Sequence, residues 1–436
     1  TTQMKSFLVI SLIGILIMAF DLMPAFMAAT LIPVLYWVFN VAPTTVVFNA
    51  WTQQIPWLLI GSLIFAQVMN KTGLSKRIAY GLLLLARGNF TLLLVMFLVA
   101  GLVLALFVPA AMARLAIFMA IGISLVEAMG WKPNSGKAIM MLVTISLASQ
   151  TPAYAWMTGG NGTILFTGLL NSVGYPLSWL QFALYSGVPV IIVMFLQLGA
   201  VALMAKVIDK NQEKQDSAQV REYIQEEYRA LGKIDKDQIK VLVLFVIILG
   251  LLITASYHSL NPGMVFMLVA LVCFLPGINL MTADDAKNIQ FSTVLLLTGC
   301  IAIGDVATEL KLGDILVNAL TPYLPHTLIG LTIVVFFITF VGNMIATPLA
   351  LMPILTIPIV SIAQAMGAGP VGMAFIFNHS CQAVIFPHET AGDLLLFSLG
   401  WVNMKNFIKA YTIRSIVVFV SLFVIYIPWF KLMGVL

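Results

Sequence analysis

Long apolar runs recur along the whole chain, from Phe7 to the C-terminus, and only short polar segments separate them. Each run could cross about 30 Å of hydrocarbon as an α-helix, and no series of alternating ten-residue segments indicates a β-barrel. The pattern therefore predicts an all-α polytopic membrane protein. The run over 7–20 is expected to be its first helix rather than a signal peptide.

One segment breaks this pattern, because residues 206–240 contain eight basic and eight acidic side chains. It divides the chain into a first membrane region, 1–205, and a second, 241–436. Within it, Tyr223, Ile224, Tyr228 and Leu231 recur at helical spacing, which predicts an amphipathic helix on the surface. A solvated linker without such a helix is the alternative.

The two membrane regions resemble each other weakly. Residues 107–121 and 340–354 agree at five positions, and 57–74 and 295–312 also agree at five. Apolar sequences match easily by chance, but the two matches come in the same order on either side of the charged segment. This order favours a transporter built from two repeats of inverted topology.

Glycines and prolines interrupt the apolar runs at corresponding places in the two regions. We predict a re-entrant hairpin near 107–130 followed by a broken helix near 148–168, and a second pair near 340–365 and 377–393. A broken helix leaves unpaired N–H groups, whose partial positive charge attracts an anion. The pattern therefore indicates an anion carrier.

Composition agrees with this interpretation, since 61% of residues are hydrophobic, 9% are charged and the mean hydropathy is +1.04. The net charge of +5 is too small and too scattered to indicate nucleic-acid binding. The motif "TGGNGT" lacks the lysine of a phosphate-binding loop, and "PHET" lacks the second histidine of a zinc site. We expect no metal and no cofactor, and localisation in a bacterial cytoplasmic membrane.

The stretches 226–245 and 280–316, together with the two hairpin segments, resemble the divalent anion sodium symporters (DASS). This family includes sodium-coupled dicarboxylate and citrate carriers and sodium-independent dicarboxylate exchangers. The resemblance implies a scaffold domain and a moving transport domain in each protomer, a homodimer, and substrate bound at the hairpin tips. It covers nearly the whole chain.

The hairpin tips depart from the Ser-Asn-Thr signature of that family. The first reads "PAAMAR" over 109–114 and the second "GNMIAT" over 342–347. By position, the resemblance places six residues at the substrate: Ala110, Ala111, Met112, Asn343, Met344 and Thr347. Because the first three carry no side-chain donor, the usual substrate contacts and sodium sites are altered here.

Arg114 is the most informative polar residue, because a cation within a membrane helix costs about 2.5–3.5 kcal/mol on insertion scales. We hypothesise that Arg114 binds substrate and replaces part of the charge that sodium supplies in symporters. The carrier would then exchange anions without sodium. The alternative is that Arg114 reaches an interface or pairs with backbone carbonyls at the hairpin tip.

Five residues in the broken segments are further candidates for the substrate site. His379 and His388, with Ser380 beside the first, could bind a carboxylate or exchange a proton, or form only structural hydrogen bonds. Asn161 and Thr163 could line the site or cap a helix that restarts there.

The sequence thus predicts an elevator-type secondary transporter that exchanges C4 or C5 dicarboxylates such as succinate, malate or 2-oxoglutarate. Sodium symport of dicarboxylate, citrate or sulfate is the alternative, in which backbone carbonyls hold the sodium ion. An anion channel is less favoured, because two dissimilar halves in one chain lack symmetric rings of charge. An enzyme is disfavoured, since no acid, base and metal groups cluster at helical spacing.

Overall fold

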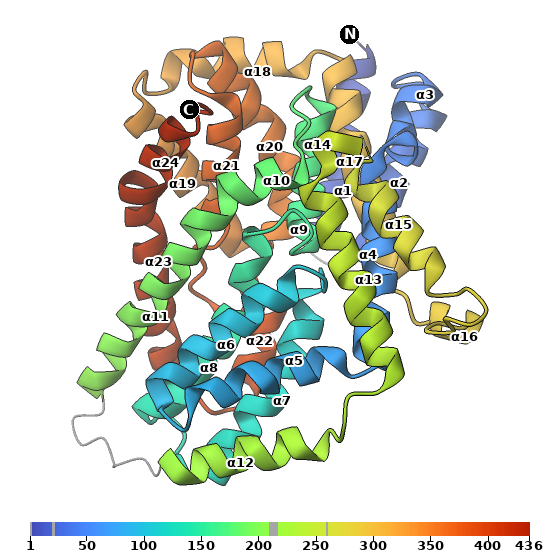
Figure 1. Cartoon of the computed structure of the whole chain (residues 1–436). Helices are drawn as coiled ribbons and strands as arrows, with labels where there is room; N and C mark the ends of the chain where they lie inside the picture. Colours follow the sequence, from blue (N-terminus) through green and yellow to red (C-terminus); the bar gives the residue numbers. More distant parts are fainter. Residues whose placement is uncertain (1, 20–21, 209–216, 259) are drawn as a thin grey trace.

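The computed structural model describes residues 2–19, 22–208, 217–258 and 260–436, and within these ranges the chain is helical without a β-strand. Figure 1 shows the helices as an elongated bundle. The α-helices before the charged linker are α1 (Thr2–Ala19), α2 (Ala25–Val38), α3 (Thr44–Val47), α4 (Gln54–Lys71), α5 (Leu74–Leu83), α6 (Phe90–Ala105), α7 (Ala111–Ala128), α8 (Gly136–Gln150), α9 (Asn161–Ser172), α10 (Trp179–Phe182) and α11 (Val188–Ile208).

The linker carries one helix, α12 (Ser217–Ala230), on which Val220 and Ile224 are buried. Residues 209–216 of the predicted linker lie outside the described part of the chain. The later helices are α13 (Lys236–Ile253), α14 (Ala255–His258), α15 (Pro262–Val272), α16 (Ala283–Ala286), α17 (Phe291–Glu309), α18 (Leu312–Leu320), α19 (Leu328–Ile345), α20 (Pro348–Ala365), α21 (Pro370–Ser380), α22 (Ala391–Ser398), α23 (Met404–Ser421) and α24 (Ile427–Leu432).

The protein is a multi-pass integral membrane protein. Among the residues that the structure describes, six helical segments are long and apolar enough to cross a bilayer, and four shorter apolar helices accompany them. The six are Ala111–Ala128, Trp179–Lys206, Phe291–Glu309, Leu328–Ile345, Pro348–Ala365 and Met404–Leu432. Large apolar side chains that face outward, such as Leu203 and Val424, suit contact with lipid rather than water.

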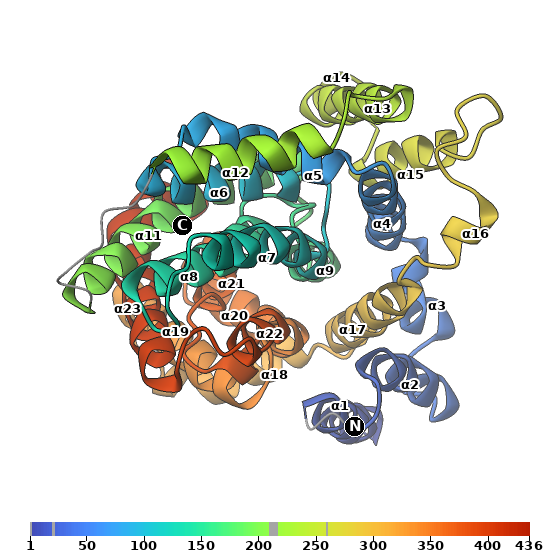
Figure 2. The ribbon, with the colours of Figure 1, turned by 90° about the horizontal axis from the view of Figure 1, so that it is seen from below.

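The helices form two groups when the molecule is viewed along the bundle. Figure 2 places α1–α4, α13 and α15–α17 on one side and the remaining long helices on the other. Helices α9 and α20 of the second group pack against α17 of the first. The first group thus contains the early helices of both membrane regions, and the second contains their interrupted segments.

Two glycines allow close helix packing within the first group. A Cβ on Gly61 of α4 would lie 2.6 Å from the Phe266 carbonyl carbon of α15, and one on Gly299 of α17 would lie 2.1 Å from the Ala29 carbonyl oxygen of α2. Gly61 and Gly299 are matched positions in the weak sequence alignment of the two regions. The same residue type therefore permits the same kind of backbone contact in each region.

Each region then continues with a helix pair and an interrupted helix, in the same order. The pairs are α6–α7 and α19–α20, which begin at Phe90 and Leu328, upstream of the ranges expected for the hairpins. The interrupted helices are α8–α9 and α21–α22, and their breaks, 151–160 and 381–390, are equally long. Short 3-10 turns, η3 (Thr151–Tyr154) and η6 (Pro387–Glu389), lie inside these breaks.

A long helix follows each break, and each contains one π-helical turn. These turns are η4 (Ala183–Gly187), between α10 and α11, and η7 (Leu422–Tyr426), between α23 and α24. Single π-turns widen a helix locally and occur often near functional sites. Here both turns contact the ring of His379, through Ser186 of the first and Tyr426 of the second.

Candidate functional site

The ends of the interrupted segments enclose one cavity of about 340 Å³. Its wall combines segments from both membrane regions, which the chain brings together only through folding. The lining residues are Pro109, Ala110, Ala111, Met112, Gln150, Ala153, Tyr154, Gly160, Asn161, Gly162, Thr163, Gln290, Thr347, Pro348, Leu349, Met352, Glu389, Thr390 and Ala391.

Four helices begin at this cavity: α7 at Ala111, α9 at Asn161, α20 at Pro348 and α22 at Ala391. The first N–H groups of a helix have no partner within the helix, and the helix dipole adds partial positive charge there. Two N-termini come from each membrane region. The cavity is thus positively polarised from four directions, which favours an anion.

The two membrane regions differ in whether a side chain caps these helix N-termini. In the second region, Thr347 Oγ1 accepts a hydrogen bond from the Ala350 N–H (3.4 Å), and Thr390 Oγ1 accepts one from the Asp393 N–H (3.1 Å). In the first region, α7 follows Ala110, which has no acceptor in its side chain, and α9 follows Gly160. The N–H groups of the first region are therefore more available to a ligand.

Arg114 lies behind the cavity wall and does not line the cavity, and its side chain is fully buried. Its guanidinium donates to the Ser149 carbonyl from Nε (3.0 Å) and Nη2 (2.7 Å), and to the Gly159 carbonyl from Nη1 (2.8 Å). Nη1 also donates to the Val108 carbonyl. Arg114 thus satisfies carbonyls that the segment between α6 and α7 and the end of α8 with its following break leave unpaired.

In the second region, a side-chain amide donates to the backbone carbonyls at the break. Asn343 Nδ2 donates to the carbonyls of Cys381 (3.3 Å) and Ala383 (3.0 Å), which follow the end of α21. Arg114 is the fourth residue of α7, and the fourth residue of α20 is Leu351. The second region therefore has a neutral amide, and no cation, at its break.

The histidines lie away from the cavity wall. His379 is buried, its Nε2 is 3.1 Å from Ser186 Oγ, and its ring stacks on Tyr426 with centroids 4.2 Å apart. His388 is exposed, with Nε2 3.3 Å from the Met344 carbonyl. Ser380 Oγ donates within its own helix, to the Ile376 carbonyl (2.7 Å).

Six of the twelve residues predicted at the site line the cavity, and six do not. Those lining it are Ala110, Ala111, Met112, Asn161, Thr163 and Thr347. Those outside it are Arg114, Asn343, Met344, His379, Ser380 and His388. Thr163 also has a structural role, because its Oγ1 accepts from the Gly160 N–H (3.1 Å) and donates to the Gly160 carbonyl (2.8 Å).

Sequence reasoning missed Gln150, Tyr154, Gln290, Glu389 and Thr390, which also line the cavity. Glu389 is the most informative of them, with only 1% of its surface exposed. Its Oε1 accepts from the N–H groups of Ile385 (3.0 Å) and Phe386 (2.7 Å), while Oε2 has no hydrogen-bond partner among the described residues. Its position in the broken segment was the only available signal.

A buried polar cluster joins the two sides of the cavity. Asp393 Oδ1 accepts from Ser146 Oγ (2.6 Å), Gln150 Nε2 (2.9 Å) and Tyr411 OH (2.5 Å). Arg414 stacks over the Tyr411 ring at 4.4 Å and donates to Ser146 Oγ (3.2 Å). Helix α8 of the first region is therefore tied to α22 and α23 of the second next to the cavity.

The part of the chain that the structure describes contains no group of three or more His, Cys, Asp or Glu side chains that could hold a metal ion. The side-chain chemistry at the cavity is instead that of amides, hydroxyls and one carboxylate, next to an apolar surface from Pro109 to Met112 and from Leu349 to Met352. Such a lining suits a small organic anion held mainly by backbone N–H groups.

Comparison with known proteins gives two matches. The family model described as the sodium:sulfate symporter transmembrane region matches residues 2–436. Inner membrane protein YbhI of Escherichia coli (strain K12) is 23% identical over 411 residues, which cover 89% of this chain and 83% of that protein. The family match extends across the helix pairs, the breaks and the cavity.

Proposed function

Because the chain belongs to the sodium:sulfate symporter (DASS) family of anion transporters, we propose that it is a secondary transporter which exchanges C4 or C5 dicarboxylates without sodium. The observation that carries this proposal is the cavity at which four helices begin. Two pairs of N-termini, one from each region, match the two carboxylates of such a molecule.

The cavity also supports an organic dianion over sulfate. Its volume of about 340 Å³ lies near the lower end of the range of small-molecule pockets, roughly 300–1,000 Å³. The methyl groups of Ala110 and Ala111 and the side chains of Met112 and Met352 offer contact to a carbon skeleton. Sulfate has no apolar part that could use this surface.

The position of Arg114 supports exchange over sodium symport. Unwound carbonyls at broken helices are where transporters of this type coordinate small cations. Here the carbonyls of Val108, Ser149 and Gly159 accept from Arg114, so they are occupied without sodium. A buried cation also disfavours movement of the empty carrier, since Arg114 forms no ion pair within the described part of the chain and a bound anion would add negative charge nearby.

The two helix groups suggest how transport proceeds. We assign the group containing α4 and α17 to a scaffold and the group containing the cavity to a moving transport domain, in two repeats of inverted topology with re-entrant pairs α6–α7 and α19–α20. The two groups meet largely through apolar side chains of α9, α20 and α17, which permit sliding. A homodimer would hold the scaffold still while the transport domain moves.

The test is uptake of labelled succinate and 2-oxoglutarate into proteoliposomes, loaded or not with unlabelled dicarboxylate, with and without a sodium gradient. Uptake should require internal dicarboxylate, saturate with external substrate and be unaffected by sodium. Sodium-driven uptake into empty vesicles would instead establish symport. Non-saturating flux without countertransport would indicate a channel.

A further inference from the structure

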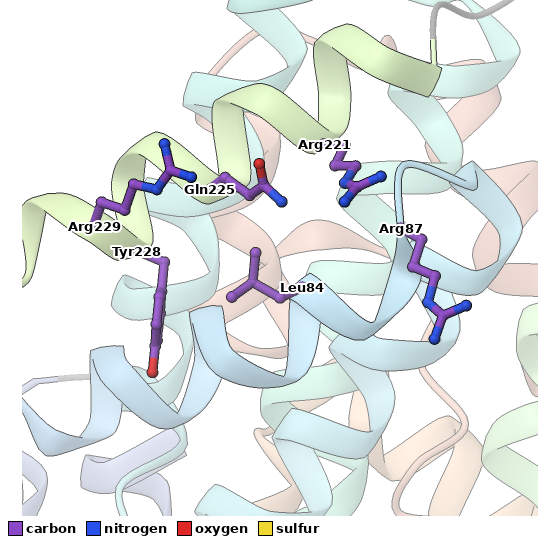
Figure 3. Close-up of a pocket in the computed structure, with 6 residues that line it drawn as sticks. All are labelled: Leu84, Arg87, Arg221, Gln225, Tyr228 and Arg229. Carbon is purple, nitrogen blue, oxygen red and sulfur yellow. The ribbon is translucent and has the colours of Figure 1, made fainter.

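A second concave site lies outside the cavity, at the end of the bundle where α12 crosses it. It is a groove of about 550 Å³ between α12 and the 3-10 turn η2 (Leu84–Ala86), shown in Figure 3. We name it the linker groove. Its lining residues are Leu84, Arg87, Arg221, Gln225, Tyr228 and Arg229.

The residue spacing along α12 places basic side chains on the helix face that lines this groove. Arg221, Gln225 and Arg229 follow each other at four-residue intervals, which places them on one face of a helix. Val220 and Ile224 are buried on the side that packs against the bundle. Figure 3 shows Arg221 and Arg229 on α12, above the segment that carries Leu84 and Arg87.

The opposite wall is fixed by a strained turn. Arg87 has φ 51°, a left-handed conformation that favours glycine or asparagine, and Gly88 follows with φ 84°. A Cβ on Gly88 would lie 1.9 Å from the Ser217 carbonyl oxygen, so the turn touches the first residue of α12. An arginine is thus held at an unfavourable backbone position beside the groove.

The charge of the linker groove is not neutralised by described residues. Arg87, Arg221 and Arg229 are exposed, and none forms an ion pair within the described part of the chain. Ion pairs do form elsewhere among the described residues, as between Lys240 and Asp237 (2.8 Å). Three guanidinium groups therefore border one concave surface and are free to bind an anion.

This groove lies on the end of the bundle that carries most of the basic segments. Arg77 donates to the Leu231 carbonyl (2.9 Å), and Gln219 Nε2 donates to the Ala128 carbonyl (3.4 Å), so the segments containing α5, α7 and α12 meet there. Basic segments between membrane helices face the cytoplasm. The linker groove therefore faces the cytoplasmic leaflet, whose anionic lipids attract such groups.

We propose that the linker groove binds the phosphate group of an anionic phospholipid. Guanidinium groups bind phosphate oxygens through paired N–H donors, which lysine cannot reproduce. Leu84 lines the groove and the neighbouring Leu85 is 58% exposed, so an apolar surface adjoins the phosphate site where acyl chains would lie. This site lies outside the transport cavity, and its occupancy would fasten the linker to the membrane surface.

The experiment uses the full chain in a neutral detergent and follows its thermal unfolding by tryptophan fluorescence. Dioctanoyl-phosphatidylglycerol, dioctanoyl-phosphatidylcholine and inorganic phosphate are titrated separately. The proposal expects the midpoint to rise with the anionic lipid alone. An equal rise with phosphatidylcholine would overturn it, and an equal rise with inorganic phosphate would overturn the assignment to a lipid.

Variants locate the binding. Arg221→Gln with Arg229→Gln should weaken the apparent affinity for phosphatidylglycerol about thirtyfold, because each basic group near an anionic surface contributes roughly fivefold. Lys233→Gln with Lys236→Gln removes the same charge outside the linker groove and should retain affinity. Arg87→Gln, on the other wall, should cost about fivefold and tests the site independently of the folding of α12. Unchanged affinity in both sets of groove variants would overturn the proposal.

Discussion

The two walls of the cavity have the same architecture but different chemistry. On the first, α7 and α9 follow Ala110 and Gly160, which have no side-chain acceptor, and the buried guanidinium of Arg114 donates to the carbonyls beneath them. On the second, Thr347 and Thr390 cap α20 and α22, and the neutral amide of Asn343 binds the carbonyls. The first wall therefore combines bare N–H groups with a fixed positive charge.

This difference indicates a division of labour between the walls. An anion gains most from N–H groups that no side chain already occupies, and a positive charge behind them adds to the attraction. We therefore expect the first wall to dominate substrate affinity. The second wall should contribute geometry, and its Glu389 should limit how much negative charge the cavity holds.

Replacing Arg114 should have the largest effect. Arg114→Ala leaves three carbonyls unpaired at a cost of about 1–3 kcal/mol each, so exchange of labelled succinate should be lost and the thermal midpoint should fall. Lys405→Gln, which removes an exposed cation, is the control and should retain both properties. Exchange by Arg114→Ala at the rate of the unmodified protein would remove the proposed role.

The same variant also tests whether the guanidinium of Arg114 occupies carbonyls that would otherwise bind a cation. With Arg114 gone, the freed carbonyls could coordinate a small cation, so a sodium gradient should partly restore uptake into proteoliposomes. Potassium at the same concentration serves as the control. If sodium has no effect on an Arg114→Ala carrier that remains folded, the carbonyls do not form a cation site.

Asn343→Asp should have a smaller effect of the same kind. The carboxylate has the same size but cannot donate to the carbonyls of Cys381 and Ala383. We expect a loss of stability of about 1–3 kcal/mol, seen as a lower thermal midpoint, and a severalfold slower exchange. An effect larger than that of Arg114→Ala would reverse the proposed ranking of the two walls.

Glu389→Gln should improve binding. The amide oxygen can still accept from Ile385 and Phe386, while the charge beside the substrate is removed. Relief of a repulsion of about 1 kcal/mol lowers the KM for dicarboxylate roughly fivefold. Glu309→Gln, at an exposed carboxylate of α17, should leave KM unchanged. A higher KM in Glu389→Gln would contradict a repulsive role.

Substitutions at the N-cap positions should produce the smallest effects. Removing a cap on the second wall should lower stability, whereas adding one on the first wall should not. Thr347→Val removes an N-cap from α20 and should cost about 0.5–2 kcal/mol of stability with little change in KM. Ala110→Ser adds an acceptor at the start of α7, where it competes with substrate for N–H groups. It should raise KM severalfold and leave stability unchanged or slightly higher. Unchanged KM in Ala110→Ser would show that the bare N–H groups do not bind substrate.

The sequence predicted the helical class and the membrane location, because hydrophobic length acts locally. The weak alignment of the two regions was less accurate. It paired Ala110 with Asn343, whereas the helix starts pair Ala110 with Thr347, one helical turn away. Apolar helices match almost as well after a shift of four residues, so composition could not fix this register.

Contacts between distant segments could not be predicted in the same way. Arg114 was recognised as exceptional, but its carbonyl partners depend on where the end of α8 and its following break meet the start of α7. Glu389 and Gln150 reach the cavity because α22 packs against α8, a contact with no local signal. The resemblance to a family supplied the hairpin tips, and only folding placed the remaining lining residues.

The Asp393 cluster has one further consequence. Since Asp393, Gln150 and Tyr411 fasten α22 to α8, both walls should travel as a single unit, and the cavity should keep its shape on either side of the membrane. A site of unchanged shape has equal dissociation constants inside and outside. Under the proposed exchange, uptake and release would then reach half of their maximal rates at similar substrate concentrations.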